Sequence, residues 1–355
     1  MGNRPRSSHD RLSPLTTADE SRSGRRGRGC FCLAGCLSLV GVPAAIVMLL
    51  ACIPLGFRLW ADLREVELAS EVAPKTGRYV NADDVAIYIQ EHGPKDGPPV
   101  VLIHGTSAWS GTWRDTQTAL ADNGFRVIAM DLPPFGFSQR PAEARYDRPK
   151  QAARILGVLD ALNIDKAHLV GHSFGGGPTL EAALLHPDRV GKLVLVDAAI
   201  SLDSAGVEPG LAATLAGIPW LRETAIACTF QNPLVTEQVV QSMIFDPADA
   251  TPDRVALYQA PFAVKDTTPA IGAWIEELAA PGQNAWSLDR DRISALPNRT
   301  LLIWGDEDTI TPPSQARELH ELLPRSRIVW IEGAGHLPQI EDVHAFNEAL
   351  LTFLR

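Results

Sequence analysis

The sequence predicts an α/β fold with a mostly parallel central sheet and helices on both of its faces. Short apolar runs such as Val100–Ile103 are typical of strands buried on both faces. These runs alternate with helical stretches, which is the pattern of a parallel sheet with crossover helices. A Gly-x-Ser-x-Gly motif, Gly171–Gly175, also lies between one such run and a helical stretch. The 45% hydrophobic content is ordinary for a globular core.

The elements follow one another regularly from Gly77 onward. The expected strands are Arg78–Val80, Val85–Gln90, Val100–Ile103, Arg126–Met130, His168–Val170, Lys192–Val196, Thr300–Trp304 and Arg327–Ile331. The first two form a hairpin around Asn81–Asp84. The expected helices are Thr112–Asp122, Lys150–Leu162, a helix from the Ser173 turn to His186, Ser314–Leu323 and Val343–Leu354.

The N-terminal part has a different composition. Residues 1–29 are rich in Arg, Ser and Gly, and we expect a basic disordered arm. Residues 30–57 carry no charge, and as a helix they would extend about 42 Å, enough to span a bilayer core of about 30 Å. We therefore expect a transmembrane helix over 30–57 and a linker over 58–76. Seven arginines precede this run, which predicts a single-pass protein with a cytoplasmic N-terminus and a non-cytoplasmic catalytic domain.

Three other targeting signals compete with this interpretation. Leu49–Cys52 resembles the lipobox of a lipoprotein, and Arg25–Arg26 weakly resembles a twin-arginine signal. A cleavable signal peptide usually has an apolar stretch of only about 7–15 residues, which is shorter than this one. The membrane helix is the interpretation that we prefer.

Charge and cysteine content argue against nucleic-acid binding and against a disulfide-stabilised body. The whole chain carries a net charge of −10 although residues 1–64 are basic, so the body is strongly acidic and nucleic-acid binding is disfavoured. Four of the five cysteines lie in or beside the apolar run, and only Cys228 lies in the body. A disulfide framework is thereby excluded for the body, and no metal-site spacing is present.

The candidate nucleophile is Ser173. Glycines two residues to either side allow the strand and the helix to approach closely around a strained turn. The hydroxyl then lies at a helix N-terminus, where amide dipoles favour developing negative charge. A serine hydroxyl needs a base, and the base needs an orienting acid.

Among nine histidines, His336 is the expected base. It follows the last strand in a glycine-rich loop, at the sheet edge where functional residues of open α/β sheets gather. The expected acid is Asp308, in the loop after Thr300–Trp304. Asp197 is an alternative acid at the end of Lys192–Val196, and Asp306 and Glu307 remain weaker candidates, with Asp306 expected to cap a turn.

An oxyanion hole requires two backbone N–H groups. One is expected from Phe174, directly after the nucleophile, and the other from Thr106, in the loop after Val100–Ile103. His104 is expected to brace that loop. No cofactor and no metal are needed for this chemistry.

Residues 77–355 resemble the α/β-hydrolase family. The matching segments are His104-Gly105, Asp131–Ser138, Gly171–Gly176, Trp304–Asp308 and Gly335-His336. The resemblance implies a catalytic triad of Ser173, Asp308 and His336, with the amides of Thr106 and Phe174 as the oxyanion hole. Pro134 departs from the family pattern, which usually has glycine there. Family members that act as dehalogenases or epoxide hydrolases have aspartate in place of Ser173, so those activities are disfavoured.

The family also places a lid in the interval between the strands that end at Val196 and begin at Thr300. Here the expected lid covers about residues 201–288 and is rich in apolar residues. An apolar lid and a nearby membrane favour a serine esterase that hydrolyses small-molecule carboxylic esters with apolar acyl chains, of lipase or monoacylglycerol-lipase type.

Two other functions compete with ester hydrolysis. A carbon–carbon bond hydrolase of ring-fission products shares the triad and needs a basic lid residue for a substrate carboxylate, for which Arg222, Arg254 and Lys265 are candidates. A non-catalytic binding protein on a hydrolase frame would leave the triad unexplained. Turnover of a chromogenic ester separates an enzyme from a binder.

Overall fold

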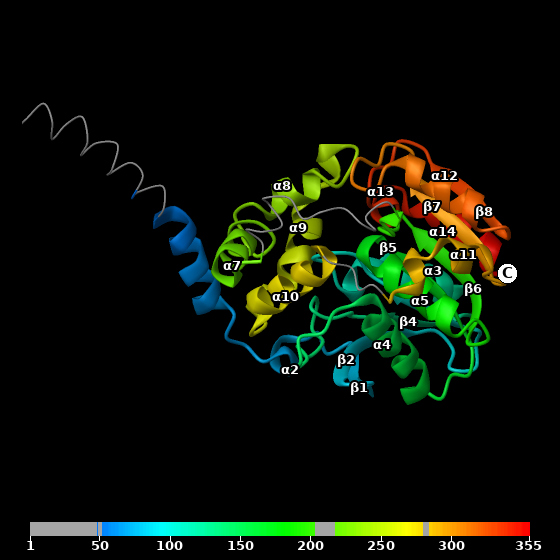
Figure 1. Ribbon diagram of the computed structural model, residues 1–355, viewed down its shortest axis with the longest axis horizontal. Coiled ribbons are helices and arrows are strands. Elements are labelled where there is room, and N and C mark those ends of the chain that lie inside the picture. Colours follow the sequence, from blue (N-terminus) through cyan, green and yellow to red (C-terminus); the bar gives the residue numbers. More distant parts are fainter. Residues whose placement is uncertain (1–47, 49–51, 203–216, 280–283) are drawn as a thin grey trace, which may run out of the picture. The chain divides into compact units, whose positions relative to one another are not determined.

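A computed structural model describes residues 48, 52–202, 217–279 and 284–355. Its centre is an eight-stranded sheet with the order β1-β2-β4-β3-β5-β6-β7-β8 (Figure 1). The strands are β1 (Gly77–Ala82), β2 (Val85–His92), β3 (Pro99–Ile103), β4 (Arg126–Met130), β5 (Ala167–His172), β6 (Val190–Val196), β7 (Arg299–Gly305) and β8 (Ser326–Ile331). β2 pairs antiparallel with both β1 and β4. From β4 onward, the neighbouring strands β4, β3, β5, β6, β7 and β8 pair in parallel. The predicted mostly parallel sheet is confirmed.

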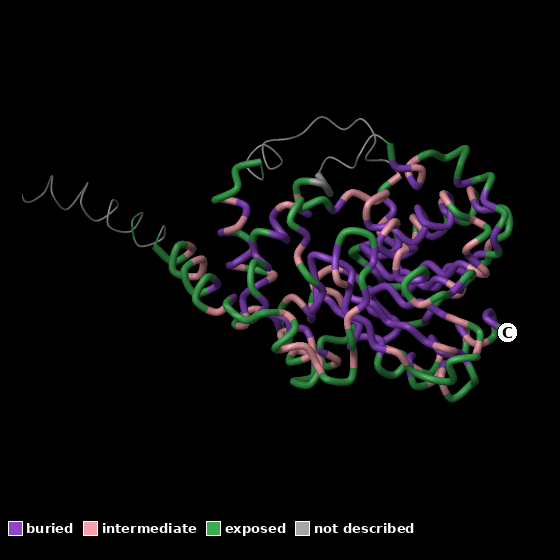
Figure 2. The backbone as a smooth tube through the Cα atoms, turned by 90° about the horizontal axis from the view of Figure 1, so that it is seen from below, coloured by how far each residue is buried: buried purple, intermediate pink, exposed green. Residues whose placement is uncertain are grey.

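Helices cover both faces because alternate residues of each central strand point to opposite sides. On one face, Val100 and Leu102 of β3 belong to a core with α3 (Arg114–Asp122) and α14 (Val343–Leu354). On the other face, Val101 and Ile103 of the same strand belong to a core with α4, α5 and α12. These helices are Arg148–Ala161, Gly176–Leu185 and Pro313–Leu322. Figure 2 shows the buried residues concentrated along the sheet.

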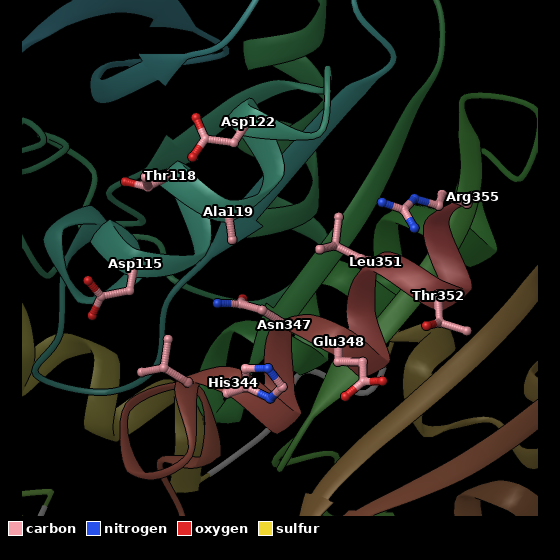
Figure 3. A pocket seen from close by; sticks show the side chains of 11 residues that line it. Asp115, Thr118, Ala119, Asp122, His344, Asn347, Glu348, Leu351, Thr352 and Arg355 are labelled. Carbon is pink, nitrogen blue, oxygen red and sulfur yellow. The ribbon is translucent and has the colours of Figure 1, made fainter.

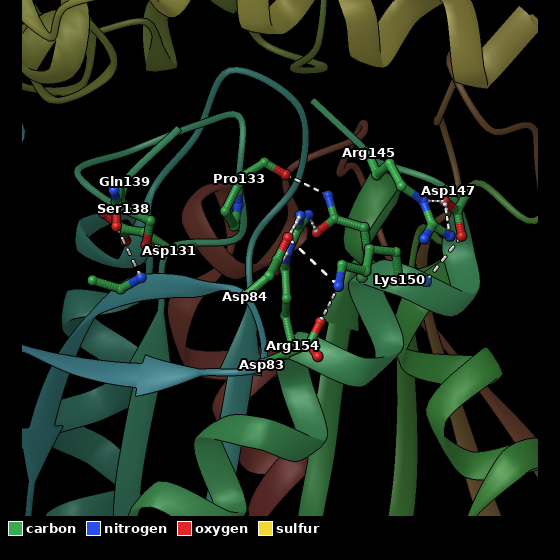
Figure 4. Close-up of polar contacts among 12 residues, drawn as sticks. Asp83, Asp84, Asp131, Pro133, Ser138, Gln139, Arg145, Asp147, Lys150 and Arg154 are labelled. Carbon is green, nitrogen blue, oxygen red and sulfur yellow. Dashed lines mark hydrogen bonds and ion pairs between the residues drawn. The ribbon is translucent and has the colours of Figure 1, made fainter. Parts of the chain in front are cut away.

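The β1–β2 hairpin is tied to α4 by charged side chains. Ala82 pairs with Val85, so the turn is tighter than the sequence predicted, and Asp83 takes a left-handed φ of 56°. The buried guanidinium of Arg154 donates from Nε and Nη2 to the two carboxylate oxygens of Asp84, each at 2.9 Å. Lys150 Nζ lies 2.6 Å from Asp83 Oδ2. Figure 4 shows this cluster between the helix and the hairpin.

A helical insertion separates β6 from β7. It contains α7 (Pro219–Cys228), α8 (Thr236–Gln241), α9 (Pro252–Gln259), α10 (Thr267–Ala279) and α11 (Arg290–Ser294). Helices α7 to α10 lie together in Figure 1, and α7 packs on α10. The expected lid over 201–288 stays a prediction, and 203–216 and 280–283 lie outside the described residues.

Residues 53–64 are helical, and side chains of residues 58–67 contact the insertion. Arg58 Nη2 donates to Glu223 Oε2 of α7 at 2.8 Å. The buried carboxylate of Glu65 accepts hydrogen bonds from the backbone N and Oγ1 of Thr268, at 2.8 and 2.5 Å, at the start of α10. The stretch predicted as a linker therefore begins with a helix that contacts the insertion.

The structure corrects the predicted membrane localisation. No helix in the described part of the chain is long and apolar enough to cross a membrane. The expected transmembrane helix over 30–57 falls largely on 30–47 and 49–51, which lie outside the described residues, as does the arm over 1–29. A single-pass topology and a membrane partner are therefore not supported.

Candidate active site

Ser173 lies in a strained turn between β5 and α5. Its φ is 50°, in the left-handed region that non-glycine residues rarely adopt. The flanking glycines are required by space, because a Cβ at Gly171 would lie 2.4 Å from Thr179 Oγ1 and one at Gly175 would lie 2.4 Å from the carbonyl oxygen of His104. The turn thus projects Ser173 from the end of the strand, as the motif predicted.

The loop after β3 lies directly against the nucleophile. A Cβ at Gly105 would come within 2.9 Å of Ser173 Cβ and 2.6 Å of His172 Nδ1. Thr106, the next residue, is half-buried in this loop. An oxyanion donor has to lie next to the nucleophile. The structure brings Thr106 and Phe174, the two predicted donors, to the end of the sheet that carries Ser173.

The three predicted triad side chains form one hydrogen-bonded chain. Ser173 Oγ lies 2.8 Å from His336 Nε2, and His336 Nδ1 lies 2.8 Å from Asp308 Oδ2. All three residues are buried, although 163 and 28 positions separate the two pairs in the sequence. This geometry allows His336 to take the serine proton while Asp308 fixes the orientation of its ring.

Asp308 is held as a carboxylate by several donors. Its Oδ1 accepts from the backbone N–H groups of Ile310 and Thr311 at 2.7 and 3.1 Å, and its Oδ2 accepts from Thr311 Oγ1 at 2.6 Å. Burial alone would raise the pKa of Asp308, but its hydrogen bond with His336 and the other contacts lower the pKa below the ordinary value.

The two neighbouring acids do not reach His336. Asp306 is exposed, and its Oδ1 accepts a 2.8 Å hydrogen bond from the backbone N–H of Gly333. It therefore caps the loop that carries His336, which agrees with the structural role predicted for it. Glu307 is exposed.

Several groups hold the His336 loop in place. The His336 backbone N–H donates to the carbonyl of Met243, in the insertion, at 2.7 Å. Glu341 accepts backbone hydrogen bonds from Gly335 and Leu337 on either side of the histidine, at 2.9 and 3.0 Å. It also accepts one from Phe245 at 2.6 Å, so a single carboxylate joins the insertion to this loop.

The sequence did not indicate the role of His172. Its Nε2 donates to the backbone carbonyl of His336 at 2.8 Å, and the two rings lie 5.1 Å apart. Burial, followed by the neighbouring His336, lowers the pKa of His172 to about 3, so the ring is neutral and acts as a fixed donor. Only its place next to Ser173 in the motif could have suggested this role.

His104 and Asp131 brace the loops around the site. His104 Nδ1 donates to the carbonyl of Gly105 at 2.8 Å, and Nε2 accepts from the N–H of Leu132 at 2.9 Å, which matches the expected bracing role. Asp131 accepts from the backbone N–H groups of Ser110 and Phe137 at 2.6 and 2.7 Å. Burial raises the pKa of Asp131 to about 6 and lowers that of His104 to about 4.

An aromatic cluster lies beside the predicted oxyanion donor Phe174. Phe135 and Trp274 each contact its ring, with centroid distances of 5.7 and 5.1 Å, and their own centroids are 5.1 Å apart. Trp274 belongs to α10, so the insertion supplies an apolar wall here. The Pro133–Pro134 peptide bond of the adjoining loop is cis.

One group of side chains could hold a metal ion. One ligand atom each of Asp197, Asp308 and His336 lie within 4.8 Å of one another. The 2.8 Å separation of His336 Nδ1 and Asp308 Oδ2 is a hydrogen-bond distance. His336 Nδ1 and Asp308 Oδ2 are therefore already hydrogen-bonded to each other.

A separate groove of about 810 Å³ lies between α3 and α14 (Figure 3). Its lining includes Asp115, Asp122, Asn347 and Glu348, and none of its lining residues belongs to the triad. This groove is therefore separate from the end of the sheet that carries Ser173.

Comparison with known proteins places this geometry in a family. The model of the alpha/beta hydrolase fold matches residues 98–343, which include Ser173, Asp308 and His336. The chain belongs to the α/β-hydrolase family. It is thus a hydrolase of this fold, and the resemblance inferred from the sequence motifs is confirmed.

Individual family members show which relatives the chain resembles. It is 33% identical over 297 residues to a 2-hydroxymuconate semialdehyde hydrolase of Pseudomonas sp. strain CF600, across 81% of this chain and 96% of the relative. A mutant of the meta-cleavage product hydrolase from Pseudomonas fluorescens IP01 matches with a TM-score of 0.60 and 30% identity, over 79% of this chain and 97% of that one. A membrane phospholipase A described as a bacterial virulence factor matches with a TM-score of 0.63 and 25% identity, over 92% of this chain and 98% of that one.

These similarities change the preferred substrate class. The sequence favours a carboxylesterase or lipase over a carbon–carbon bond hydrolase. The similarity to the 2-hydroxymuconate semialdehyde hydrolase and the meta-cleavage product hydrolase supports a hydrolase but not the esterase or lipase class, and it favours the alternative.

Proposed function

We propose that this protein is a serine hydrolase that cleaves a carbon–carbon bond next to a carbonyl group in a small dienoic acid, of the ring-fission product type. The hydrogen-bonded chain from Ser173 through His336 to Asp308 carries this proposal. The similarity to 2-hydroxymuconate semialdehyde hydrolase supplies the substrate class.

The proposed reaction begins when Ser173 Oγ attacks the carbonyl carbon and His336 Nε2 takes the serine proton. The amides of Thr106 and Phe174 stabilise the oxyanion. As the oxyanion collapses, the electron pair of the carbon–carbon bond leaves with the dienoate fragment, which takes the proton from His336. Water, deprotonated by His336, then hydrolyses the acyl-serine and releases a carboxylic acid.

The substrate carboxylate requires a cation, and Arg222 is the best of the three predicted candidates. It is buried on α7, and its Nη1 lies 2.9 Å from Glu276 Oε2 of α10, the helix that carries Trp274. Lys265 is exposed, and Arg254 lies on α9, outside the packed pair of α7 and α10. We assign Arg222 to the carboxylate, with α7 and α10 acting as a lid.

Ester hydrolysis is the second candidate. The phospholipase A structure covers 92% of this chain, against 79% for the meta-cleavage hydrolase. The apolar cluster of Phe135, Phe174 and Trp274 would also suit an acyl chain. The same triad performs both reactions, because each begins with attack on a carbonyl carbon.

The test compares a 2-hydroxy-6-oxo-dienoate with a p-nitrophenyl ester of similar size, using the full chain and its Arg222→Gln variant. We expect a higher kcat/KM for the dienoate than for the ester. Turnover of the dienoate is measured by the loss of its absorbance. Arg222→Gln should raise KM for the dienoate about tenfold, the value of one charged hydrogen bond, and leave the uncharged ester unchanged. Turnover of the ester alone would favour the second candidate, and turnover of neither would contradict both.

A further inference from the structure

A second buried carboxyl group lies beside the triad, at the end of β6. Asp197 is fully buried and takes a left-handed φ of 40°. Its backbone N–H donates to the Ile303 carbonyl at 3.1 Å, and its carbonyl oxygen lies 3.0 Å from Thr311 Oγ1, whose proton goes to Asp308. Its Oδ1 accepts from the N–H of Gly305 at 3.0 Å. These contacts fix the side chain between the ends of β6 and β7.

The carboxyl group of Asp197 lies close to that of the triad acid. Among the described residues, no donor group serves Asp197 Oδ2, although the atom is buried. One oxygen of Asp197 and one of Asp308 lie within 4.8 Å of each other and of a His336 ring nitrogen. Two carboxyl groups this close and this buried cannot both be ionised, so they share one proton.

The surroundings of the two acids decide which one holds the proton. Asp308 has two backbone N–H donors, the Thr311 hydroxyl and His336 around it, whereas Asp197 has one backbone N–H. Burial, and then the charge of Asp308, raise the pKa of Asp197 well above its ordinary value, and Glu341 adds to the same effect. A neutral carboxyl group is also a donor, which would satisfy the otherwise unpaired Oδ2.

We propose that Asp197 is a positioning residue for the triad, a neutral carboxyl group whose Oδ2–H donates a hydrogen bond to the carboxylate of Asp308. This inference rests on the proposed function, in which Asp308 orients His336. The donated hydrogen bond fixes the carboxylate and reduces its basicity. It adds no charge beside the histidine.

Two variants of the full chain separate the donor from a merely structural group. Asp197→Gly removes the carboxyl group and tolerates the positive φ, so its effect does not come from backbone strain. Asp197→Asn keeps the shape, tolerates the left-handed conformation and offers a neutral N–H donor. The readouts are kcat/KM against pH on whichever of the two substrates the wild type turns over, and the urea midpoint as the folding control.

We expect Asp197→Gly to lower kcat/KM about 10- to 100-fold, the value of one hydrogen bond to a charged group. The more basic Asp308 should also move the acidic limb of the profile to higher pH. Asp197→Asn should restore most of the activity and leave the limb in place.

Two outcomes would overturn the assignment. A limb that moves to lower pH in Asp197→Asn would mean that an ionised Asp197 had been replaced. A wild-type profile in a folded Asp197→Gly would mean that the carboxyl group does not act on Asp308. If Asp197→Gly does not fold, the direction of the limb shift in Asp197→Asn decides alone. A wild type that turns over neither substrate would contradict the proposed function and is thereby distinguished from failure of this inference.

Discussion

At the scale of single residues, the proposed nucleophile Ser173 lies within hydrogen-bond distance of His336. Replacing it with alanine removes the attacking oxygen and leaves the buried turn otherwise unchanged. Because the triad acts as a unit, Ser173→Ala should lower turnover about 10⁴-fold or more. Steady-state kinetics with the accepted substrate would measure this loss, and circular dichroism would check the fold. A folded variant that keeps a tenth of the activity would exclude Ser173 as the nucleophile.

Gly105 is the residue at which a single methyl group should be most damaging. Its added Cβ would overlap Ser173 Cβ and the His172 ring. Gly105→Ala should therefore displace the nucleophile from His336 and lower kcat at least about 10²-fold, the scale expected when reacting groups move by about 1 Å. Gly56→Ala is the matched control, since nothing lies within 4 Å of its added Cβ. Equal activity in the two variants would contradict this close approach.

The sequence could predict the candidate catalytic residues, but not most of the residues that hold them in position. Ser173 and His336 follow apolar strands in short glycine-rich segments, and this local signal is visible in the sequence alone. Glu341 offers no such signal, because its three partners are backbone N–H groups, two in the adjoining His336 loop and one at Phe245, 96 positions away. Asp197 was visible as an acid at a strand end, but the proton that distinguishes it from Asp308 depends on burial.

Among the elements, the β1–β2 hairpin gives a direct test of its packing on α4. Asp84→Asn would remove the counter-charge of the fully buried Arg154. Because Asp84 itself is partly exposed to solvent, the loss should be about 1–3 kcal/mol, less than for a pair that is buried on both sides. The exposed pair of Arg145 and Asp147 in the same region is the control, and Arg145→Gln should cost less than about 1 kcal/mol. Urea unfolding measures both values. Equal losses would show that burial of Arg154 does not set the cost.

Element positions were predicted well where apolar periodicity was strong. The sequence placed a strand on every one of the eight observed strands, with differences of a few residues at their ends. Contacts of 58–67 with the insertion were not predicted, since they depend on single side chains such as Glu65 in a stretch without periodicity. The helices between β6 and β7 were expected only as a lid because apolar pieces there lack regular spacing.

Stability against acid is a property of the whole molecule. Burial lowers the pKa of His104 and His168 to about 4 and that of His172 to about 3. In the unfolded chain these rings bind protons near pH ~6.5, so the unfolded state takes up more protons below that pH and stability falls as the pH drops from 7 toward 4. Asp131, with its pKa raised to about 6, has the opposite effect because the native state binds its proton first.

His168→Gln should make this decline shallower, because one of these three rings no longer titrates. His168 lies on β5 away from the triad, and its Nδ1 accepts from the N–H of Lys192, a role that glutamine can fill. The slope of unfolding free energy between pH 6 and 5 should decrease by about 1.4 kcal/mol per pH unit, the value of one proton. An unchanged slope would show that His168 is protonated in the native state.

At the scale of the whole molecule, the sequence predicted the fold class but not the localisation, and each outcome has a physical reason. The α/β class follows from apolar runs that any parallel sheet requires, and the structure confirmed it. Localisation depended on one uncharged run, and no helix of the described residues is able to cross a membrane. Substrate class was inferred from the composition of the expected lid, which is similar in hydrolases of different specificity, and the relatives favour the alternative.

The central claim is that Ser173 forms a covalent acyl intermediate with a carbonyl substrate. Rapid mixing of the full chain with the 2-hydroxy-6-oxo-dienoate, acid quenching and peptide mass spectrometry would test this claim most directly. The peptide containing Ser173 should gain the mass of the acyl fragment at early times and lose it as product forms. Consumption of the dienoate with no acyl group on Ser173 would exclude a covalent mechanism at this serine.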